Sequence, residues 1–428
     1  MSESSPKGFL AAVAKIEKNE VAAVLLSFAL VLVLMTSYSI LKPLRDALGG
    51  DWGNVGLAVT WTINFGLSLL AVAAYGAALT FIRFRAMVPG VYVFFALTFF
   101  ALFLVRTNAP DATLVNKGFY VWVSVFSLFN LSVFWSFMTD VFNKGQARRV
   151  FGVIAAGTTV GAIIGPLITA SLVDRLGANG LLLMSAGLLT VPVFVIPILR
   201  RLKTSQLHNE ETTADLSAQQ ALGTNPFSGF SVLFSDRYLL WICAFILFYV
   251  TINTFVYFEL QNLTGEYSLE FRAKVWSWIE ITTNVLTLLT ATLVTSRIVS
   301  KLGMQTALAM VPGLVALGII ALVASPVLLI LALFQIGRRV GNYAITRPSR
   351  EMLFTVLDRE KRFKAKPVID VVIYRGGDVL TAWLFTLLAD KLGLGLTGIA
   401  VVIGGIAIVW MLVAIRLGRI YNERADIS

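Results

Sequence analysis

Long uncharged stretches separated by short charged segments run along most of the chain. Eight of these stretches contain no Asp, Glu, Lys or Arg: residues 21–41, 52–82, 86–105, 118–139, 150–173, 176–199, 302–337 and 392–415. About 20 apolar residues form a helix that crosses the hydrocarbon layer of a membrane, so each stretch can span at least once. The stretch 302–337 is long enough for two crossings, and we expect the chain to reverse at Ser325 and Pro326.

Four further apolar stretches are interrupted by charged residues: 238–263, 271–297, 326–356 and 367–390. Together with the uncharged stretches they predict twelve membrane-spanning helices. Composition supports this count, because 57% of the 428 residues are hydrophobic and only 14% are charged. Such a chain has too few polar residues to cover a water-soluble protein of its size. We therefore predict an all-α integral membrane protein.

The one long hydrophilic stretch, residues 200–237, separates the first six predicted spans from the last six. This order is typical of transporters built from two six-helix halves, with the substrate site between the halves. We predict a cytoplasmic lead over 1–19, six-helix halves over 20–201 and 236–420, a cytoplasmic linker over 202–235 and a cytoplasmic tail over 421–428.

Basic residues outnumber acidic ones, 35 to 24, and many lie in short loops such as FNKGQARRVF (142–151) and DREKRFKAK (358–366). Lys and Arg in short loops remain on the cytoplasmic side of a membrane, beside anionic lipid. Both termini are therefore expected in the cytoplasm. The positive charge needs no nucleic acid as a partner, and we expect the lipid bilayer instead.

Metal, redox and enzymatic chemistry have no candidate residues. Cys243, the only cysteine, lies in an apolar span, and His208, the only histidine, lies in the polar linker. Neither a Walker A pattern nor a nucleophile elbow occurs. We expect no metal site, no catalytic residues, no cofactor and no enzyme activity.

Charged residues inside the predicted spans are the candidate functional groups. A Lys, Arg or Asp at the centre of a spanning helix costs about 2.5–3.5 kcal/mol on insertion scales, so such residues tend to face a polar cavity and mark a function. The basic ones are Lys42, Arg45, Arg338, Arg339, Arg347, Arg350 and Arg375. The acidic ones are Asp46, Asp140, Glu259, Glu280, Asp370 and Asp378.

Some of these residues have an opposite charge one helical turn away, the spacing that allows an ion pair along a helix. The pairs expected on this basis are Lys42 with Asp46, Arg347 with Glu351, and Arg375 with Asp378. Arg45 is then less compensated. Glu280 is a lone acid in its span, and it either carries a coupling proton or pairs with an arginine.

Four residues of the tenth predicted span recur at intervals of four, three and four positions: Arg339, Tyr343, Thr346 and Arg350. This spacing predicts one shared face of an α-helix, with the two guanidinium groups about 16 Å apart along the axis. Two interpretations of the buried charges stay open. Either they form ion pairs that only fix the helices, or their positive groups bind an anion, for which the planar guanidinium fork is suited. Trp135 and Tyr343 lie near the charged stretches and could stack on a substrate ring.

Small residues recur in the fifth predicted span. Gly157, Gly161 and Gly165 fall every four residues, followed by Pro166. Glycines at this spacing let a neighbouring helix approach closely. Together with Gly152 the run also resembles the fifth-helix motif of major facilitator antiporters, although LITA stands where that motif has two more glycines.

Three blocks resemble the ATP/ADP translocase type of nucleotide exchanger and its proteobacterial relatives, within the major facilitator architecture. They are SYSILKPLRDALG (37–49), FWSFMTDVFNKGQARRVFGVIAAGTTVGAIIGP (134–166) and YAITRPSREMLFTVLDREKRFKAKPVIDVVIYRGGD (343–378). The resemblance implies nucleotide exchange across a bacterial inner membrane, with Lys42 and Arg45 as phosphate contacts and Asp46 as their neighbouring acid. Pro43 and Arg45 depart from the nucleotide exchangers, which have an acid and a lysine at these positions.

We therefore expect a monomeric secondary transporter that exchanges an organic anion, such as a nucleotide or another phosphorylated metabolite, as its two halves rock around a positively lined cavity. The expected substrate-binding residues are Lys42, Arg45, Arg339, Arg350, Arg375, Tyr343 and Trp135. The expected charge-pairing or proton-coupling residues are Asp46, Asp140, Glu259, Glu280, Glu351 and Asp378. One alternative is a proton-coupled transporter of a drug, siderophore or peptidoglycan fragment. Another is a membrane scaffold or sensor that transports nothing.

Overall fold

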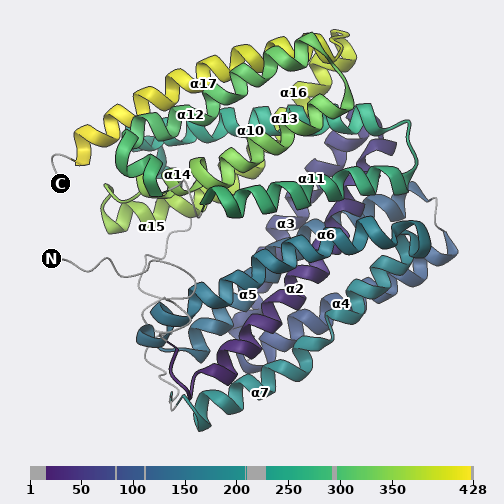
Figure 1. The fold of residues 1–428 in the computed structure, drawn as a ribbon, viewed down its shortest axis with the longest axis vertical. Coiled ribbons are helices and arrows are strands. Elements are labelled where there is room, and N and C mark those ends of the chain that lie inside the picture. The colour runs from purple at the N-terminus through teal and green to yellow at the C-terminus, as the bar shows by residue number, and fades with distance from the viewer. Residues whose placement is uncertain are drawn as a thin grey trace. The chain divides into compact units, whose positions relative to one another are not determined.

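The computed structural model describes residues 16–81, 84–109, 112–207, 209, 228–291 and 296–425. The described residues form helices joined by short turns (Figure 1). His208, most of the predicted linker, most of the N-terminal lead and the end of the tail lie outside the described residues.

The first part of the chain contains α2 (Val21–Leu48), the short η1 (Gly49–Asp51), α3 (Gly53–Phe81), α4 (Phe84–Asn108), α5 (Thr113–Val141), α6 (Lys144–Leu188) and α7 (Val191–Ser205). α6 contains a kink at Gly177, whose φ of 62° and ψ of −178° are not helical. The helical stretch Lys144–Ser205, 62 residues long, therefore supplies two crossings. These are the fifth and sixth predicted spans.

The second part contains α9 (Ser228–Ser235), α10 (Arg237–Thr264), α11 (Leu269–Thr290), α12 (Ser296–Ala324), α13 (Leu328–Gly341), η3 (Asn342–Thr346), α14 (Arg347–Leu353), α15 (Arg359–Pro367), η4 (Val368–Ile373), α16 (Tyr374–Thr386), η5 (Leu387–Lys391) and α17 (Leu396–Ala425). η3, η4 and η5 are π-helical segments. Because α12 ends at Ala324 and α13 begins at Leu328, the predicted reversal at Ser325 and Pro326 is confirmed.

Nine helical stretches among the described residues are long and apolar enough to cross a membrane. The kinked α6 adds a tenth crossing. The other two are α11 and the continuous run from α13 through α14, which are less apolar because charged residues interrupt them. The predicted all-α fold with twelve transmembrane helices is confirmed.

Contacts within the chain group the residues into two units. Unit 1 comprises residues 1–48, 66–213 and 268–281, and unit 2 comprises 49–65, 214–267 and 282–428. The start of α3 thus belongs to unit 2 and the start of α11 to unit 1. The functional halves at 20–201 and 236–420 stay a prediction.

In unit 1, α6 packs against α2 along the glycine stripe (Figure 1). A Cβ added at Gly157 would lie 2.7 Å from the carbonyl oxygen of Phe28, and one at Gly161 would lie 2.6 Å from that of Leu32. Gly165 faces Ser39 in the same way. No side chain fits at these positions, so the two backbones come into direct contact. This contact holds α2, which carries Lys42 and Arg45, in a fixed position.

In unit 2, the end of α17 is tied to the start of α10. Asp236 caps α10 by accepting a hydrogen bond from the backbone N–H of Tyr238 at 3.0 Å. The same carboxylate pairs with Arg424 at 2.9 Å and with Lys361 at 3.5 Å. Arg424 also lies over the Tyr238 ring, 4.6 Å from its centre. One carboxylate therefore joins three elements at this end of the unit.

Candidate functional site

The charged residues of α2 have partners that helical spacing does not reveal. Lys42 Nζ lies 2.8 Å from Glu280 Oε1 of α11, within unit 1. The Lys42 side chain is 21% exposed and that of Glu280 only 4%. The partner that the structure shows for Lys42 thus lies on another helix, and the spacing along α2 does not predict it. Of the two possibilities for Glu280, the structure shows a pair with a basic residue, and that residue is a lysine.

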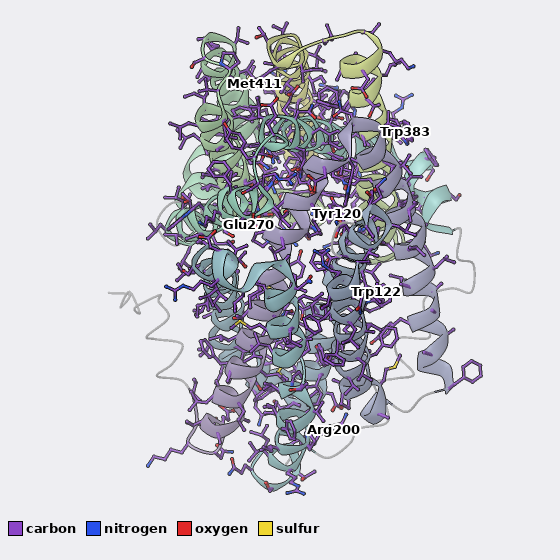
Figure 2. The ribbon with its side chains drawn as sticks, turned by 90° about the vertical axis from the view of Figure 1, so that its right-hand side faces the viewer. Tyr120, Trp122, Arg200, Glu270, Trp383 and Met411 are labelled. Atoms are coloured by element: carbon purple, nitrogen blue, oxygen red, sulfur yellow. The ribbon has the colours of Figure 1, made fainter. Side chains whose placement is uncertain are left out.

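Asp46 is occupied by its neighbour in the chain. Arg45 donates from Nε at 2.9 Å and from Nη2 at 2.6 Å to the same Asp46 oxygen. Arg45 Nη1 also donates to Ser124 Oγ of α5 at 3.3 Å, and the guanidinium lies 5.4 Å from the centre of the Tyr120 ring (Tyr120 is labelled in Figure 2). The expectation that Arg45 is less compensated is therefore wrong.

Arg338 of α13 is a buried cation in a neutral environment within unit 2. Only 3% of its surface is exposed. It donates to Gln335 Oε1 from Nε at 3.2 Å and from Nη2 at 2.6 Å, and Nη2 also donates to Asn253 Oδ1 of α10 at 2.8 Å. The guanidinium carbon lies 5.7 Å from the centre of the Tyr249 ring. Amide oxygens and a ring face thus surround this charge, and no described carboxylate pairs with it.

The adjacent Arg339 is 93% buried and lies over the ring of Tyr343, 5.8 Å from its centre. The predicted α-helical face from Arg339 to Arg350 is interrupted, because residues 342–346 form the π-helical η3. Pro348, which has no N–H to donate, stands just after it. An i→i+5 segment changes the register of the helix, so the spacing of four, three and four no longer defines one α-helical face.

Arg350 lies in a network of acids at the end of α14. Its Nη2 is 3.5 Å from Glu351 Oε1 and 3.8 Å from Asp370 Oδ1. Glu351 also accepts a hydrogen bond from Lys366, in the last turn of α15. The expected pairing of Glu351 with Arg347 is therefore wrong, since the turn between α14 and α15 brings Lys366 to that carboxylate. Arg350 thus has two carboxylate neighbours, and its role as a substrate contact stays a prediction.

The remaining predicted residues lie in several places. Arg375 and Asp378 stand one turn apart in α16, and Asp378 accepts a hydrogen bond from Thr254 of α10 at 3.4 Å. Asp140, near the end of α5, pairs with Lys203 of α7 at 2.9 Å. Trp135 packs beside Phe134 and Phe151 in unit 1, with ring centres 5.2 and 5.3 Å away. Glu259 of α10 is 5% exposed.

Three residues around Arg338 were not predicted as site residues: Tyr249, Asn253 and Gln335. The sequence carried a signal for Gln335, which precedes Arg338 by one helical turn. It carried none for Tyr249 or Asn253, because their contact depends on how α10 packs against α13. These side chains, rather than a carboxylate, hold the guanidinium.

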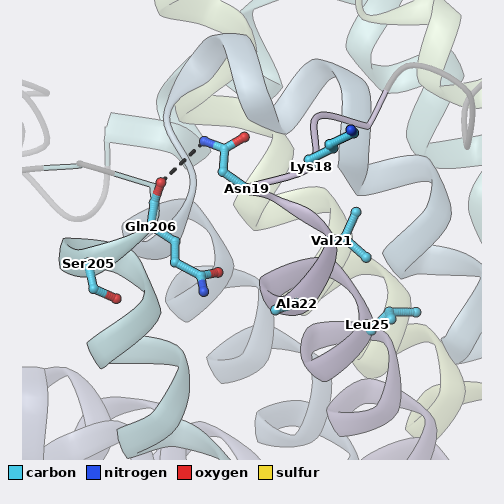
Figure 3. A pocket seen from close by; sticks show the side chains of 7 residues that line it. All are labelled: Lys18, Asn19, Val21, Ala22, Leu25, Ser205 and Gln206. Atoms are coloured by element: carbon cyan, nitrogen blue, oxygen red, sulfur yellow. Dashed lines mark hydrogen bonds between the residues drawn. The ribbon is translucent and has the colours of Figure 1, made fainter.

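A separate groove of about 610 Å³ lies in unit 1, between the start of α2 and the end of α7 (Figure 3). Asn19 donates across it to the backbone oxygen of Gln206 at 3.2 Å. Its seven lining residues contain a single charged side chain, that of Lys18. The groove therefore lacks the buried charges that make the Arg338 environment a candidate.

Comparison with known families identifies the fold. The model of the Major Facilitator Superfamily matches residues 23–346. The chain belongs to this superfamily. No curated protein matches the sequence. The chain is thus a multi-pass secondary transporter of a small molecule, and its buried charges belong to a transport protein.

Solved structures of other transporters have the same fold. A bacterial homologue of the iron transporter ferroportin, in an inward-facing state, is 12% identical with a TM-score of 0.67, over 94% of this chain and 100% of that one. The nucleoside transporter NupG is 13% identical with a TM-score of 0.60, over 94% and 99% of the two chains. A bacterial homologue of the human lysosomal transporter Spinster is 11% identical with a TM-score of 0.59, over 96% and 98%. These similarities concern the fold.

Proposed function

We propose that this transporter exchanges an organic anion, preferably a nucleotide or another phosphorylated metabolite, across a bacterial inner membrane. We propose a monomer. The basic loops favour a cytoplasmic position for both termini. The observation that carries the proposal is Arg338, a 97% buried arginine that no described carboxylate neutralises.

A guanidinium buried without a counter-charge is costly in free energy. Gln335 and Asn253 offset part of this cost with their amide oxygens. Nη1 of Arg338 remains buried with no hydrogen-bond partner among the described residues. An arriving phosphate or carboxylate supplies both the missing charge and a pair of parallel acceptors. Arg338 therefore binds an anion better than it binds a neutral solute.

Lys42 and Arg45 support the same substrate class through the resemblance to nucleotide exchangers. Their pairs with Glu280 and Asp46 neutralise them when no substrate is present. Both side chains keep some exposed surface, 21% for Lys42 and 16% for Arg45. A phosphate reaching α2 can thus contact these cations, whereas an uncharged solute gains nothing from them.

Exchange follows from the charge balance. The empty carrier holds the uncompensated charge of Arg338 inside the membrane, and a bound anion removes it. Conversion between the two access states is therefore faster with an anion bound than without one. Transport in one direction then depends on anion on the other side.

A thermal-stability screen tests this substrate class in the purified full-length protein. Nucleotides, other phosphorylated metabolites, dicarboxylates and neutral nucleosides are added separately. A ligand that binds only the folded state at 100 times its Kd stabilises by about 2.7 kcal/mol, so its Tm rises. We expect a rise with a phosphorylated anion and none with the matching nucleoside. Arg338→Gln removes the rise, whereas the exposed Arg347→Gln keeps it. Equal shifts for nucleoside and nucleotide would exclude the proposal.

Buried acids favour proton-coupled transport of another compound as a second candidate. Glu259 and Glu280 are 5% and 3% exposed, and acids inside the spans of transporters often belong to proton relays. Under this candidate, uptake by proteoliposomes collapses when a protonophore removes the pH gradient. Under the anion-exchange proposal, by contrast, uptake continues when the pH is equal on both sides of the membrane.

A further inference from the structure

Arg106, in the last turn of α4, is a buried cation whose described partners are neutral. It is 4% exposed. Its Nε donates to Asn179 Oδ1 at 2.9 Å, and its Nη1 donates to Asn116 Oδ1. The guanidinium carbon lies 5.3 Å from the centre of the Phe119 ring. No described carboxylate pairs with Arg106, so two amides and a ring hold its charge, as they do for Arg338.

Three helix ends meet at this guanidinium, all within unit 1. α4 packs against both α5 and α6. Asn116 lies in the first turn of α5, and Asn179 lies two residues after the kink at Gly177, where α6 begins its second crossing. Because α2, α3 and α4 make three crossings before this point, Arg106 lies at the membrane face opposite the N-terminus.

One edge of the Arg106 guanidinium stays open. Nη2 donates to no described residue, and it is not among the side-chain atoms that are fully buried without a hydrogen-bond partner. The small exposed part of the side chain therefore includes Nη2. The two asparagines fix the inner edge of the guanidinium, and its remaining N–H groups are directed to the surface of the unit.

The fold does not require a cation at this place. α12 is the third crossing of the second six-span set, as α4 is of the first, and it ends at Ala324 inside the uncharged stretch 302–337. Burying a guanidinium without a counter-charge costs free energy. The carbonyl groups at the end of α4 offset part of that cost with their partial negative charge. The rest of the charge is available to an anion.

The surroundings of Arg106 indicate which anion reaches it. A guanidinium edge matches phosphate, which a lipid headgroup or a soluble phosphorylated compound can supply. From Phe84 to Arg106 the helix is about 33 Å long at 1.5 Å per residue, and the hydrocarbon layer is about 30 Å thick, so Arg106 lies at the depth of the headgroups. The neighbouring Leu104, Val105 and Leu114 are each at least 48% exposed, which suits contact with lipid tails.

We propose that Arg106 binds the phosphate group of an anionic phospholipid in the leaflet opposite the N-terminus, with Asn116 and Asn179 holding the guanidinium in place. The bound lipid neutralises the buried charge and stabilises the contact of α4 with α5 and α6. Arg338 lies in the other unit, and the lipid site does not depend on which substrate the carrier transports.

Thermal unfolding of the full-length protein in detergent micelles, titrated with phosphatidylglycerol, tests the site. Phosphatidylcholine is the lipid control without net charge, and inorganic phosphate tests a soluble source. We expect Tm to rise at lower concentrations of phosphatidylglycerol than of phosphatidylcholine, and to stay constant with inorganic phosphate. Loss of charge-assisted hydrogen bonds weakens binding at least about tenfold, so Arg106→Gln should move the midpoint of the phosphatidylglycerol titration by that factor. Arg175→Gln, an exposed basic residue near the same face of unit 1, should keep the wild-type midpoint.

A carboxylate placed beside Arg106 separates lipid binding from the packing of the helix ends. Asn179→Asp keeps the shape of the side chain and neutralises the guanidinium from within the protein, so it should move the midpoint as Arg106→Gln does. A wild-type midpoint in the Asn179→Asp protein would overturn the proposal, and so would a rise in Tm with inorganic phosphate that equals the rise with phosphatidylglycerol. Arg338→Gln should leave the lipid titration unchanged, so failure of the lipid site and failure of the anion-exchange proposal are distinguishable.

Discussion

At the scale of single residues, the Lys42–Glu280 pair links a candidate substrate-binding residue of α2 to a buried carboxylate of α11. The carboxylate is 96% buried at its side chain and the two charged atoms are 2.8 Å apart. Removing one partner of such a pair leaves the other charge uncompensated in a low-dielectric environment.

Lys42→Met should therefore destabilise the protein by about 3 kcal/mol, since Glu280 is left buried without its cation. The double variant Lys42→Met with Glu280→Gln removes both charges and should recover most of the loss. Thermal unfolding of the three proteins in detergent measures this. A double variant no more stable than Lys42→Met would mean that Glu280 does not depend on Lys42.

Residue-scale prediction from the sequence works for the burial of Asp46, Glu259, Glu280 and Arg339, and it fails for Arg347 and Asp140, which are exposed. It also fails for the partners of the charged residues. Spacing along one helix suggested Asp46 for Lys42 and Glu351 for Arg347. The structure pairs Lys42 with Glu280 of another helix, and it pairs Glu351 with Arg350 and Lys366. Those partners depend on which helices pack together, and one sequence does not contain that information.

At the scale of elements, the contact between α2 and α6 depends on missing side chains. A Cβ at Gly161 would lie 2.6 Å from the Leu32 carbonyl oxygen and 2.9 Å from the Met35 Cβ, so one of the two helices must move. The glycine spacing on α6 was visible in the sequence. Its partner helix was not.

Gly161→Ala should destabilise unit 1 by about 1–3 kcal/mol through overpacking. Gly152→Ala is the control on the same helix, because nothing lies within 4 Å of an added Cβ there. That control should be neutral or stabilising by up to about 1 kcal/mol, since alanine favours the helix. The two Tm values compare the effects, and equal values would show that α6 does not need close approach at Gly161.

The contacts of Asp236 at the start of α10 make the stability of unit 2 depend on pH in the acidic range. Burial alone would raise the pKa of Asp236, but hydrogen bonds from Arg424 and from the Tyr238 backbone N–H outweigh it and hold the pKa below its ordinary value. An acid with a lowered folded pKa stabilises the protein above its unfolded pKa of about 3.9, and this stabilisation is lost as the pH falls through the folded value.

Wild-type protein should therefore lose stability more steeply than Asp236→Asn as the pH falls below about 4. The asparagine still caps α10 but cannot pair with Arg424. Unfolding temperatures between neutral pH and pH 3 provide the comparison. Parallel curves for the two proteins would contradict the pairing.

Irregular helices were the other feature that the sequence did not reveal. Twelve spans and the turn at Ser325–Pro326 follow from hydropathy, because a bilayer dictates helix length. The π-helical η3 next to Arg339 does not, since Pro348 signals a local break but not the form that the break takes. As a result, the single face predicted for Arg339 and Arg350 was wrong.

At the scale of the whole molecule, charge is distributed unevenly over the candidate groups. Lys42, Arg45 and Arg350 each have a carboxylate partner, whereas Arg338 has two amides and a ring. Of these four groups, Arg338 is the one with no described carboxylate as a partner.

Exchange of labelled nucleotide in proteoliposomes tests the central claim most directly. With unlabelled nucleotide inside, we expect rapid uptake from outside, and with an empty lumen almost none. Loss of the charge-assisted hydrogen bonds of Arg338 costs about 1.5–3 kcal/mol, so Arg338→Gln should lower exchange at least tenfold, while Arg347→Gln should match the wild type. Uptake that ignores internal nucleotide, or Arg338→Gln exchange at the wild-type rate, would contradict the account.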